Sequence, residues 1–321
     1  MKIKMTFLSK ILPEDHFKRK WLSILITLSV SAPLTLFGIY GIGEYGLSLF
    51  VLIPFLIGFC PVVIYGQKKE IRIKEALSIA FLTLLLFAIG LFVFAIEGLI
   101  CLAMATPIAA VITLVGSLAG WTVLNYKKNS STLSIIILIV SIPLTAFIEK
   151  DNKVRTIAVT TSIEIKANPS TVWKNVIQFP ELQKPTEFLF NYGISYPINA
   201  KIDGTGVGAI RHCNFTTGSF VEPITIWDEP KLLQFSVDEC PPPMSELSFW
   251  DIDAPHLHDF FVSKKGQFKL TELPNGNTLL EGTTWYTHKI KPEFYWQPWS
   301  NYIIHKIHDR VLVHIKKNSE V

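Results

Sequence analysis

The hydrophobic positions follow different patterns in the two halves of the chain. Up to about residue 150 they form long apolar runs, near 21–40, 47–65, 76–96, 99–124 and 133–148. A helix needs about 20 mainly apolar residues to cross the hydrocarbon core of a membrane. The first four runs reach this length, whereas the fifth is shorter and contains Pro143. The pattern predicts an all-α, multi-pass membrane domain over residues 1–150, with about five transmembrane helices.

The charges between these runs predict an orientation. Basic residues lie between the second and third runs and between the fourth and fifth, namely Lys68, Lys69, Arg72, Lys74, Lys127 and Lys128. Since Lys and Arg concentrate in cytoplasmic loops, we expect these loops and the N-terminus to face the cytoplasm of a bacterial inner membrane. The C-terminal domain would then be extracytoplasmic, or cytoplasmic if 133–148 does not span. Glu97 is interpreted as part of an outer turn, because an intramembrane carboxylate is costly.

Beyond a charged linker at 149–154, apolar and polar positions alternate. Residues 157–165 have the period-two pattern of a strand. Asn168-Pro169-Ser170 then opens a short helix. Six further strands are predicted at 198–203, 207–215, 219–227, 231–238, 266–273 and 278–289, with a Pro- and aromatic-rich insertion at 239–262. The expected order is therefore one strand, two short helices, six strands and a long helix.

The predicted long helix runs from about Pro292 to Lys317. Apolar residues recur in it at three- and four-residue steps, which gives one apolar face: Trp296, Ile303, Ile304, Ile307, Val311 and Ile315. His305 falls on the polar side, and His314 falls among the aliphatic residues. An amphipathic helix that closes a strand-rich segment predicts a curved sheet around it, with an apolar cavity between the two.

Residues 155–318 resemble the SRPBCC or START-like superfamily, which includes polyketide-cyclase-like proteins. The resemblance rests on the run Ile163 to Trp173, with its A-x-P-x-x-V-W helix start, and on Gly282-Thr283-Thr284-Trp285-Tyr286 followed by the Trp-rich helix. More narrowly, the chain resembles a bacterial group of membrane-anchored SRPBCC proteins. The resemblance implies an α+β helix-grip domain over 151–321, in which a seven-stranded antiparallel sheet wraps round the last helix. It supplies no universal catalytic residues.

Composition narrows the possible partners. Mean hydropathy is +0.36 with 49% hydrophobic residues, which is unusual for a soluble enzyme, and the net charge is only +4. The second half contains no basic stripe interleaved with aromatic residues, so nucleic acid is not expected as a partner. The four cysteines form no CxxC pair, and free thiols are favoured.

A glycine-rich segment formally fits a dinucleotide-binding motif. The run Gly204-Thr205-Gly206-Val207-Gly208-Ala209 matches GxGxxG/A. That motif requires a following helix whose N-terminus faces the pyrophosphate. The residues after it read as a strand, so a hairpin turn at Asp203-Gly204 is favoured and no cofactor is expected.

The next predicted hairpin carries the candidate chemistry. A turn centred on Thr217-Gly218 would pair His212 with Glu222 across the two strands. The residues of the same face are Ile210, Asn214, Phe220, Ile224 and Ile226. On the concave face a His–Glu couple could serve as an acid/base pair, although a polar pair that only orients the cavity is favoured. A turn shifted by one residue would reverse the face of these side chains.

The insertion supplies two further candidates. His256 and His258 lie near two aspartates, but their spacing matches no recognised metal site, so no metal is predicted. Phe249, Trp250, Phe260 and Phe261 are predicted to cover a cavity mouth.

The sequence predicts membrane-anchored binding of an apolar or amphipathic small molecule, for which a lipid is one candidate. The predicted ligand-binding residues are Ile163, Ile210, His212, Asn214, Phe220, Glu222, Ile224, Phe235, Trp250, Trp285, Trp299, Ile303 and Ile307. Two alternatives stay open. One is a cyclase- or hydrolase-type enzyme that uses His212 and Glu222, and the other is a sensor or assembly module in which the spans carry the function. A binding role is favoured over an enzymatic one.

Overall fold

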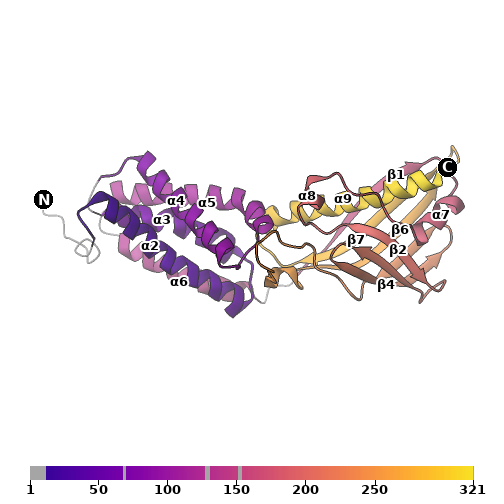
Figure 1. Ribbon diagram of the computed structural model, residues 1–321, viewed down its shortest axis with the longest axis horizontal. Helices are drawn as coiled ribbons and strands as arrows, with labels where there is room; N and C mark the ends of the chain where they lie inside the picture. Colours follow the sequence, from indigo (N-terminus) through magenta and orange to yellow (C-terminus); the bar gives the residue numbers. More distant parts are fainter. Residues whose placement is uncertain (1–11, 68–69, 127–130, 151–153, 321) are drawn as a thin grey trace. The chain divides into compact units, whose positions relative to one another are not determined.

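The computed structural model describes residues 12–67, 70–126, 131–150 and 154–320, which form two compact units. The helical unit comprises Met1–Lys153 with the short segments Ser248–Pro255 and Ile290–Pro292. The sheet unit comprises Val154–Leu247, His256–Lys289 and Glu293–Val321. Figure 1 labels most of the helices and strands of the two units.

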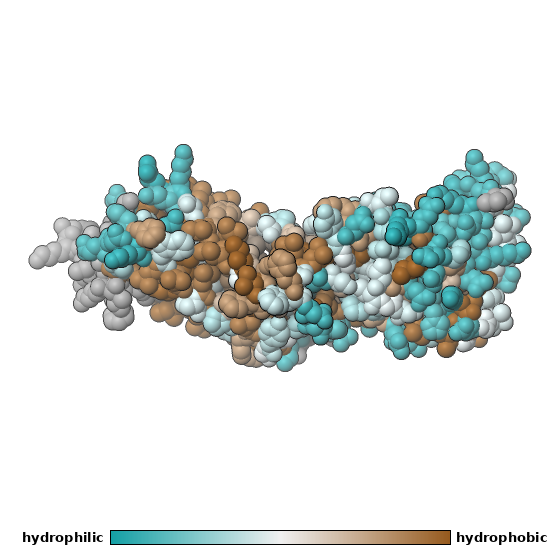
Figure 2. Space-filling view, in the orientation of Figure 1, coloured by the Kyte–Doolittle hydropathy of each residue, from teal (hydrophilic) through white to brown (hydrophobic). Residues whose placement is uncertain are grey.

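The helical unit consists of long apolar helices. They are α2 (His16–Leu36), which continues into the π-helix η1 (Phe37–Ile42); η2 (Ser48–Leu52), which continues into α3 (Ile53–Tyr65); α4 (Ile73–Val93); α5 (Leu99–Tyr126); and α6 (Ser131–Glu149). In the described part of the chain, four helical stretches are long and apolar enough to span a membrane: His16–Ile42, Ser48–Tyr65, Ile73–Val93 and Leu99–Asn125. The segment Leu133–Glu149 is a shorter apolar helix. Figure 2 shows the hydrophobic residues that dominate the visible surface of these helices.

Helices α3 and α5 pack closely because glycines line their contact. A Cβ atom on Gly58 would overlap the backbone oxygen of Thr113, and one on Gly116 would overlap the backbone oxygen of Phe55. Small residues allow helix backbones to approach closely, which is the usual basis of helix association in apolar surroundings.

Polar contacts join the turns at one end of the helical unit. The Tyr45 hydroxyl donates to the Glu97 carboxylate at 2.9 Å. The Leu47 N–H donates to both oxygens of the Glu149 carboxylate, at 3.1 and 2.9 Å. Glu97 lies in the turn between α4 and α5, as predicted, and the end of α6 is joined to the turn that precedes η2.

The sheet unit has the predicted order of elements. β1 (Thr156–Ile165) is followed by α7 (Pro169–Ile177) and α8 (Phe188–Asn191). The remaining elements are β2 (Pro197–Asp203), β3 (Ile210–Phe215), β4 (Gly218–Asp228), β5 (Leu232–Ser236), η3 (Pro255–Leu257), β6 (Phe261–Glu272), β7 (Thr278–His288) and α9 (Glu293–Ser319). The strands form one seven-stranded sheet in the order β1-β7-β6-β5-β4-β3-β2, with antiparallel pairing throughout. The predicted helix-grip fold class is confirmed.

Two strands begin several residues from their predicted starts. β6 begins at Phe261 rather than at residue 266, so it includes the last two residues of the predicted insertion. β3 begins at Ile210 rather than at residue 207, because Gly204, Gly206 and Gly208 have φ of 89°, 81° and 90°. This left-handed backbone is accessible to glycine and makes a turn. No helix follows it, in agreement with the rejection of the dinucleotide motif.

Helix α9 lies along the sheet (Figure 1) and packs directly against it. Leu280 of β7 and Val311, Leu312 and Ile315 of α9 belong to one buried hydrophobic cluster. At Gly282 an added Cβ would lie 3.6 Å from the Leu312 side chain, which is ordinary van der Waals contact. The C-terminal half of α9 is therefore in contact with the sheet, and the polar interior described below lies among the same two elements.

Candidate functional site

The hairpin of β3 and β4 places Arg211, not His212, beside Glu222. The predicted pairing of His212 with Glu222 is wrong, because the turn lies at Thr216 and Thr217, one residue earlier than assumed. Arg211 is paired with Glu222, and His212 with Val221. A one-residue shift reverses the face of every side chain in a strand. Neither the favoured polar pair of His212 and Glu222 nor the alternative acid/base couple therefore forms, and the His212 ring lies 3.8 Å from Asp203.

The Arg211 guanidinium is enclosed by aromatic rings and one carboxylate. Its side chain is 2% exposed, it donates to the Glu222 carboxylate, and its Nε donates to the Ile177 carbonyl oxygen at 3.2 Å. Three aromatic ring centroids lie 5.4 to 5.6 Å from it, those of Phe179, Phe235 and Phe268. Burial raises the pKa of the Glu222 carboxyl, against the opposing effect of the guanidinium.

Burial lowers the expected reactivity of the neighbouring thiol, that of Cys213. Cys213 is buried on the same strand as Arg211, and burial raises the pKa of its thiol to about 12. The thiolate is the reactive form of cysteine. The thiol therefore stays protonated at neutral pH, which disfavours a nucleophilic role for Cys213 beside the Arg211–Glu222 pair.

A row of polar side chains runs along β7 and faces α9. Thr284, Tyr286 and His288 share one face of β7, because alternate residues of a strand point the same way. The Tyr286 hydroxyl donates to the Asn301 amide oxygen at 2.7 Å. His308 of α9 contacts the Thr284 hydroxyl through Nε2 at 2.8 Å. These contacts place hydrogen-bonding groups between helix and sheet at successive positions.

The imidazole of His308 is held neutral. Its Nδ1 lies 3.1 Å from the Thr161 hydroxyl, which also contacts Nδ1 of His305 at 2.7 Å. Burial, together with the nearby His305, lowers the pKa of His308 to about 4. A neutral imidazole has one donor and one acceptor, and the two threonine hydroxyls can satisfy both.

His288 is the exception in the row. It is 7% exposed, and neither of its ring nitrogens has a hydrogen-bond partner in the part of the chain that the structure describes. Burial lowers the pKa of His288, so this imidazole is also neutral. A buried polar group without a partner costs about 1–3 kcal/mol. The interior therefore contains one donor and one acceptor that no described protein atom satisfies.

The other predicted ligand-binding residues divide between the interior and the outside. Residues that belong to the buried cluster or pack against it are Ile163, Phe220, Ile224 and Phe235, and those half-buried on α9 are Trp299, Ile303 and Ile307. Ile210 is 40% exposed, and the half-buried Asn214 donates to Asn199 at 2.7 Å. Trp285 points to the face of the sheet opposite to that of Tyr286, and the centroid of its ring lies 4.1 Å from the Lys265 ammonium.

The two histidines of the insertion lie in different environments. His256 is 5% exposed and lies 3.8 Å from the Glu246 carboxylate, whereas His258 is exposed. Trp250 and Phe249 are 56% and 88% exposed, while Phe260 is buried and Phe261 lies in β6.

The roles of Arg211 and His288 and the contacts of His308 were not predicted from the sequence. The sequence did contain a signal for Arg211. Alternate residues of a strand face the same side, so Arg211 lies on the same face as Ala209, Cys213 and Phe215, an apolar set typical of an inward face. His288 shares its parity with Leu280 in the same way. No local signal could have shown that His288 would lack a partner, since that depends on the distant residues of α9.

Comparison with known proteins gives fold likenesses of low similarity. No protein-family model matches the chain, and no curated protein sequence matches it. A solved protein of Nitrosospira multiformis is 17% identical, with a TM-score of 0.33, over 50% of this chain and 94% of that one. A norcoclaurine synthase of Thalictrum flavum in complex with a transition-state analogue is 13% identical, with a TM-score of 0.34, over 53% and 97%. The Aha1 protein of Colwellia psychrerythraea is 15% identical, with a TM-score of 0.30, over 51% and 97%. At these values the likenesses carry no argument about function.

Proposed function

We propose that the chain is a membrane-anchored protein whose sheet unit binds an amphipathic small molecule between β7 and α9. His288 is the observation that carries the proposal. Its neutral ring offers one donor and one acceptor in an enclosed, mainly apolar interior. Ligand sites combine apolar walls with a few polar groups that fix orientation. The expected guest has a hydroxyl or carbonyl group to meet His288 and an apolar body.

The neighbouring contacts support this assignment. Thr284 and Tyr286 already meet partners on α9, so their positions are fixed without a guest. Phe261 lies against Tyr286 at a ring-centroid distance of 5.1 Å, which supplies an apolar wall beside His288. A ligand that contacts His288 would complete the row of polar contacts between strand and helix.

Recovery of the guest with the intact protein tests the proposal. The full chain is extracted from cells in polymer-bounded membrane discs and analysed by native mass spectrometry for bound small molecules. We expect an amphipathic molecule to co-isolate with the wild type and to fall at least about 5-fold in His288→Leu, as for the loss of one buried hydrogen bond. Equal recovery from both proteins would overturn the role of His288.

A matched control separates recognition from a general loss of structure. His212→Leu removes an imidazole that is partly exposed on β3, and should leave the bound molecule unchanged. His288→Asn keeps one donor and one acceptor in a smaller side chain and should restore part of the binding. Circular dichroism of each variant shows whether the sheet unit is folded.

We further propose that the chain crosses the membrane five times, with α6 as the fifth span. The Glu149 carboxylate at the end of α6 binds the Leu47 N–H, and Glu97 binds Tyr45, so these turns belong to one end of the helical unit. At the other end, the Trp121 indole donates to the Ile71 carbonyl oxygen at 3.0 Å. The 19 residues of α6 give a length of about 28 Å, close to the thickness of the hydrocarbon core.

Five crossings place the sheet unit on the side opposite to the basic loops. With those loops cytoplasmic, the sheet unit would be extracytoplasmic in a bacterial inner membrane. Fusions of alkaline phosphatase and of green fluorescent protein after Tyr126 and after Glu320 test this. We expect fluorescence at the first site and phosphatase activity at the second. Fluorescence at both sites would contradict the fifth crossing.

A further inference from the structure

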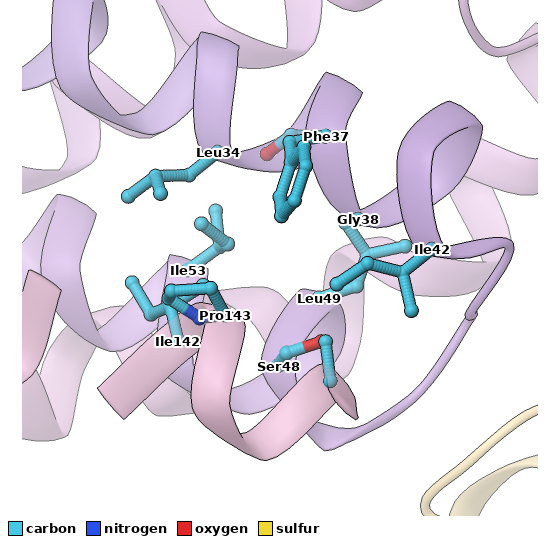
Figure 3. A pocket seen from close by; sticks show the side chains of 11 residues that line it. Leu34, Phe37, Gly38, Ile42, Ser48, Leu49, Ile53, Ile142 and Pro143 are labelled. Carbon is cyan, nitrogen blue, oxygen red and sulfur yellow. The ribbon is translucent and has the colours of Figure 1, made fainter. Parts of the chain in front are cut away.

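One space inside the helical unit is too small to hold part of a lipid. It lies between α2, η1, η2, α3 and α6, where the side chains of Leu34, Phe37, Ile142 and Pro143 surround a gap with room for about one water molecule (Figure 3). This gap gives a lipid no binding site, so the lipid contacts of the unit are expected on its outer surface.

A segment of the insertion between β5 and β6 belongs to the helical unit. Ser248–Pro255 groups with the helices rather than with the strands. The Phe249 ring packs edge-on against the Phe92 ring of α4, with 5.8 Å between the ring centroids. Phe92 lies in the last turn of the candidate span Ile73–Val93. The segment is therefore placed beside the end of a span, at the level where a membrane would meet water.

The segment presents its large aromatic side chains outward. Phe249 and Trp250 are exposed, as described above, whereas Ile252 and Ala254 are 8% and 1% exposed. The Trp250 N–H donates to the Ser248 hydroxyl at 3.1 Å, which closes a tight turn at the two aromatic residues. Because the residues that follow this turn are buried, the two rings are exposed by a segment that is fixed in place.

The neighbouring ends of two spans are apolar as well. Val93 and Phe94 at the end of α4 are 54% and 77% exposed, and Leu99 at the start of α5 is 51% exposed. Exposed apolar residues that gather in one region mark a contact with a partner or a membrane. Here they continue the outer surface of two candidate spans, so lipid is the partner that this surface fits.

The backbone and the charges of the segment set its depth. Residues 251–254 belong to neither a helix nor a strand, and such backbone is not found exposed to the hydrocarbon core. Asp251 and Asp253 are exposed, and carboxylates are also costly in that core. Tryptophan, in contrast, is enriched at the boundary between membrane and water, and phenylalanine is typical of interfacial segments. The segment therefore suits the interfacial region of a bilayer.

We propose that Ser248–Pro255 is an interfacial anchor, which inserts the side chains of Phe249 and Trp250 into the surface of the phospholipid bilayer beside the end of α4. The inference rests on the membrane location proposed above, but on neither the guest at His288 nor the fifth crossing. It assigns a membrane contact to a part of the chain that lies outside the spans, between β5 and β6.

Photolabelling of the full chain in discs of phosphatidylcholine tests the anchor. One lipid probe carries a diazirine near the carbonyl end of its acyl chain, and a second carries it near the terminal methyl group. After irradiation, labelled peptides are mapped by mass spectrometry. We expect the shallow probe to label the peptide that contains residues 248–255 at least about 5-fold more than the deep probe, because interfacial segments reach only the boundary of the acyl region. Peptides of α4 should be labelled by both probes.

Two double variants identify the side chains responsible. Phe249→Ser with Trp250→Ser removes both rings and should reduce labelling of residues 248–255 at least about 10-fold, as for the loss of large apolar side chains from a lipid contact. Phe188→Ser with Tyr192→Ser is the matched control. It removes two exposed rings of α8 in the sheet unit, which lie 4.2 Å apart between centroids, and should leave that labelling unchanged.

The peptides of α4 serve as the internal reference. Label on α4 with none on residues 248–255 would overturn the anchor and leave the membrane location intact. This is the result expected if Phe249 and Trp250 instead cover a cavity mouth or meet a second copy of the chain. Absence of label from α4 as well would overturn the membrane location and the anchor together. Recovery of a small molecule through His288 is a separate measurement that neither result affects.

Discussion

The two units satisfy their buried polar groups in different ways. In the helical unit, hydroxyls such as that of Thr27 donate to a carbonyl oxygen of the same helix, one turn earlier. In the sheet unit, partners come from other elements, as with Thr284 and His308 or Tyr286 and Asn301. The first kind of contact needs only a helix, whereas the second needs the complete tertiary structure. Substitution of a hydroxyl such as that of Thr27 should therefore have local consequences, whereas the contacts that join different helices, such as Thr113 with Pro54 or Tyr45 with Glu97, should behave like those of the sheet unit.

Each unit also contains exceptions to its own rule. Among the described residues, the hydroxyls of Thr35 and Ser117 have no hydrogen-bond partner in the helical unit, and the Trp173 indole and the His288 ring have none in the sheet unit. Because the great majority of buried polar groups are hydrogen-bonded, each of these side chains needs an explanation, and the guest proposed at His288 would supply one.

The largest effect is expected at the buried ion pair of the sheet unit. Glu222→Ala leaves the Arg211 guanidinium without its carboxylate in a site that is 2% exposed. Removal of one partner of a buried pair lowers the free energy of unfolding by about 3–5 kcal/mol. Urea denaturation of the full chain in detergent, followed by near-ultraviolet circular dichroism, measures the change.

The double variant Arg211→Met with Glu222→Leu is the control for this prediction. It replaces both charges with apolar side chains of similar length, so its free energy of unfolding should return to within about 1 kcal/mol of the wild type or exceed it. A Glu222→Ala variant as stable as the wild type would show that the pair is not buried as described.

This ion pair also shows the limit of the sequence analysis. The order and type of the elements could be predicted from the periodicity of apolar residues. Alternation of apolar and polar residues along the strands, and apolar residues at three- and four-residue steps along α9, indicate which face is buried. The register of β3 and β4 did not follow, since Thr216, Thr217 and Gly218 allow a turn at either of two positions. A displacement of one residue exchanged Arg211 for His212 and changed the predicted chemistry.

A smaller effect is expected from pH. The pKa of His308 falls to about 4 in the folded protein, against 6.5 when exposed. Below pH 6.5 the unfolded chain binds a proton at this site and the folded protein does not. The free energy of unfolding should therefore decrease as the pH falls from about 6.5 to 4, by up to about 3 kcal/mol for a shift of this size.

His308→Gln isolates this contribution. The substitution keeps a donor and an acceptor for the two threonines but removes the titration, so the loss of stability between pH 6.5 and 4 should become shallower. Urea denaturation at several pH values gives both curves. Parallel curves for the variant and the wild type would assign the pH dependence to other groups, of which His288 is the next candidate because its pKa is also lowered.

The helical unit should show its largest response at the contact of α3 and α5. Gly58→Ala places a Cβ against the backbone of Thr113 and should lower thermal stability in detergent by about 1–3 kcal/mol, the usual range for overpacking. Gly90→Ala, with no atom within 4 Å of the new Cβ, should instead gain up to about 1 kcal/mol from helix propensity. Equal effects of the two variants would argue against close packing of these helices.

The smallest effect, and the sharpest test of the comparison, is at Thr35. In detergent without lipid, Thr35→Val removes a buried hydroxyl that has no partner and should raise the free energy of unfolding by about 1 kcal/mol. Thr27→Val removes a hydroxyl that donates to Ser23 at 2.8 Å and should lower it by about 0.5–1 kcal/mol. Thermal unfolding of both variants measures the difference in sign. Changes of the same sign and size in both variants would contradict the difference between a hydroxyl with a partner, at Thr27, and one without, at Thr35.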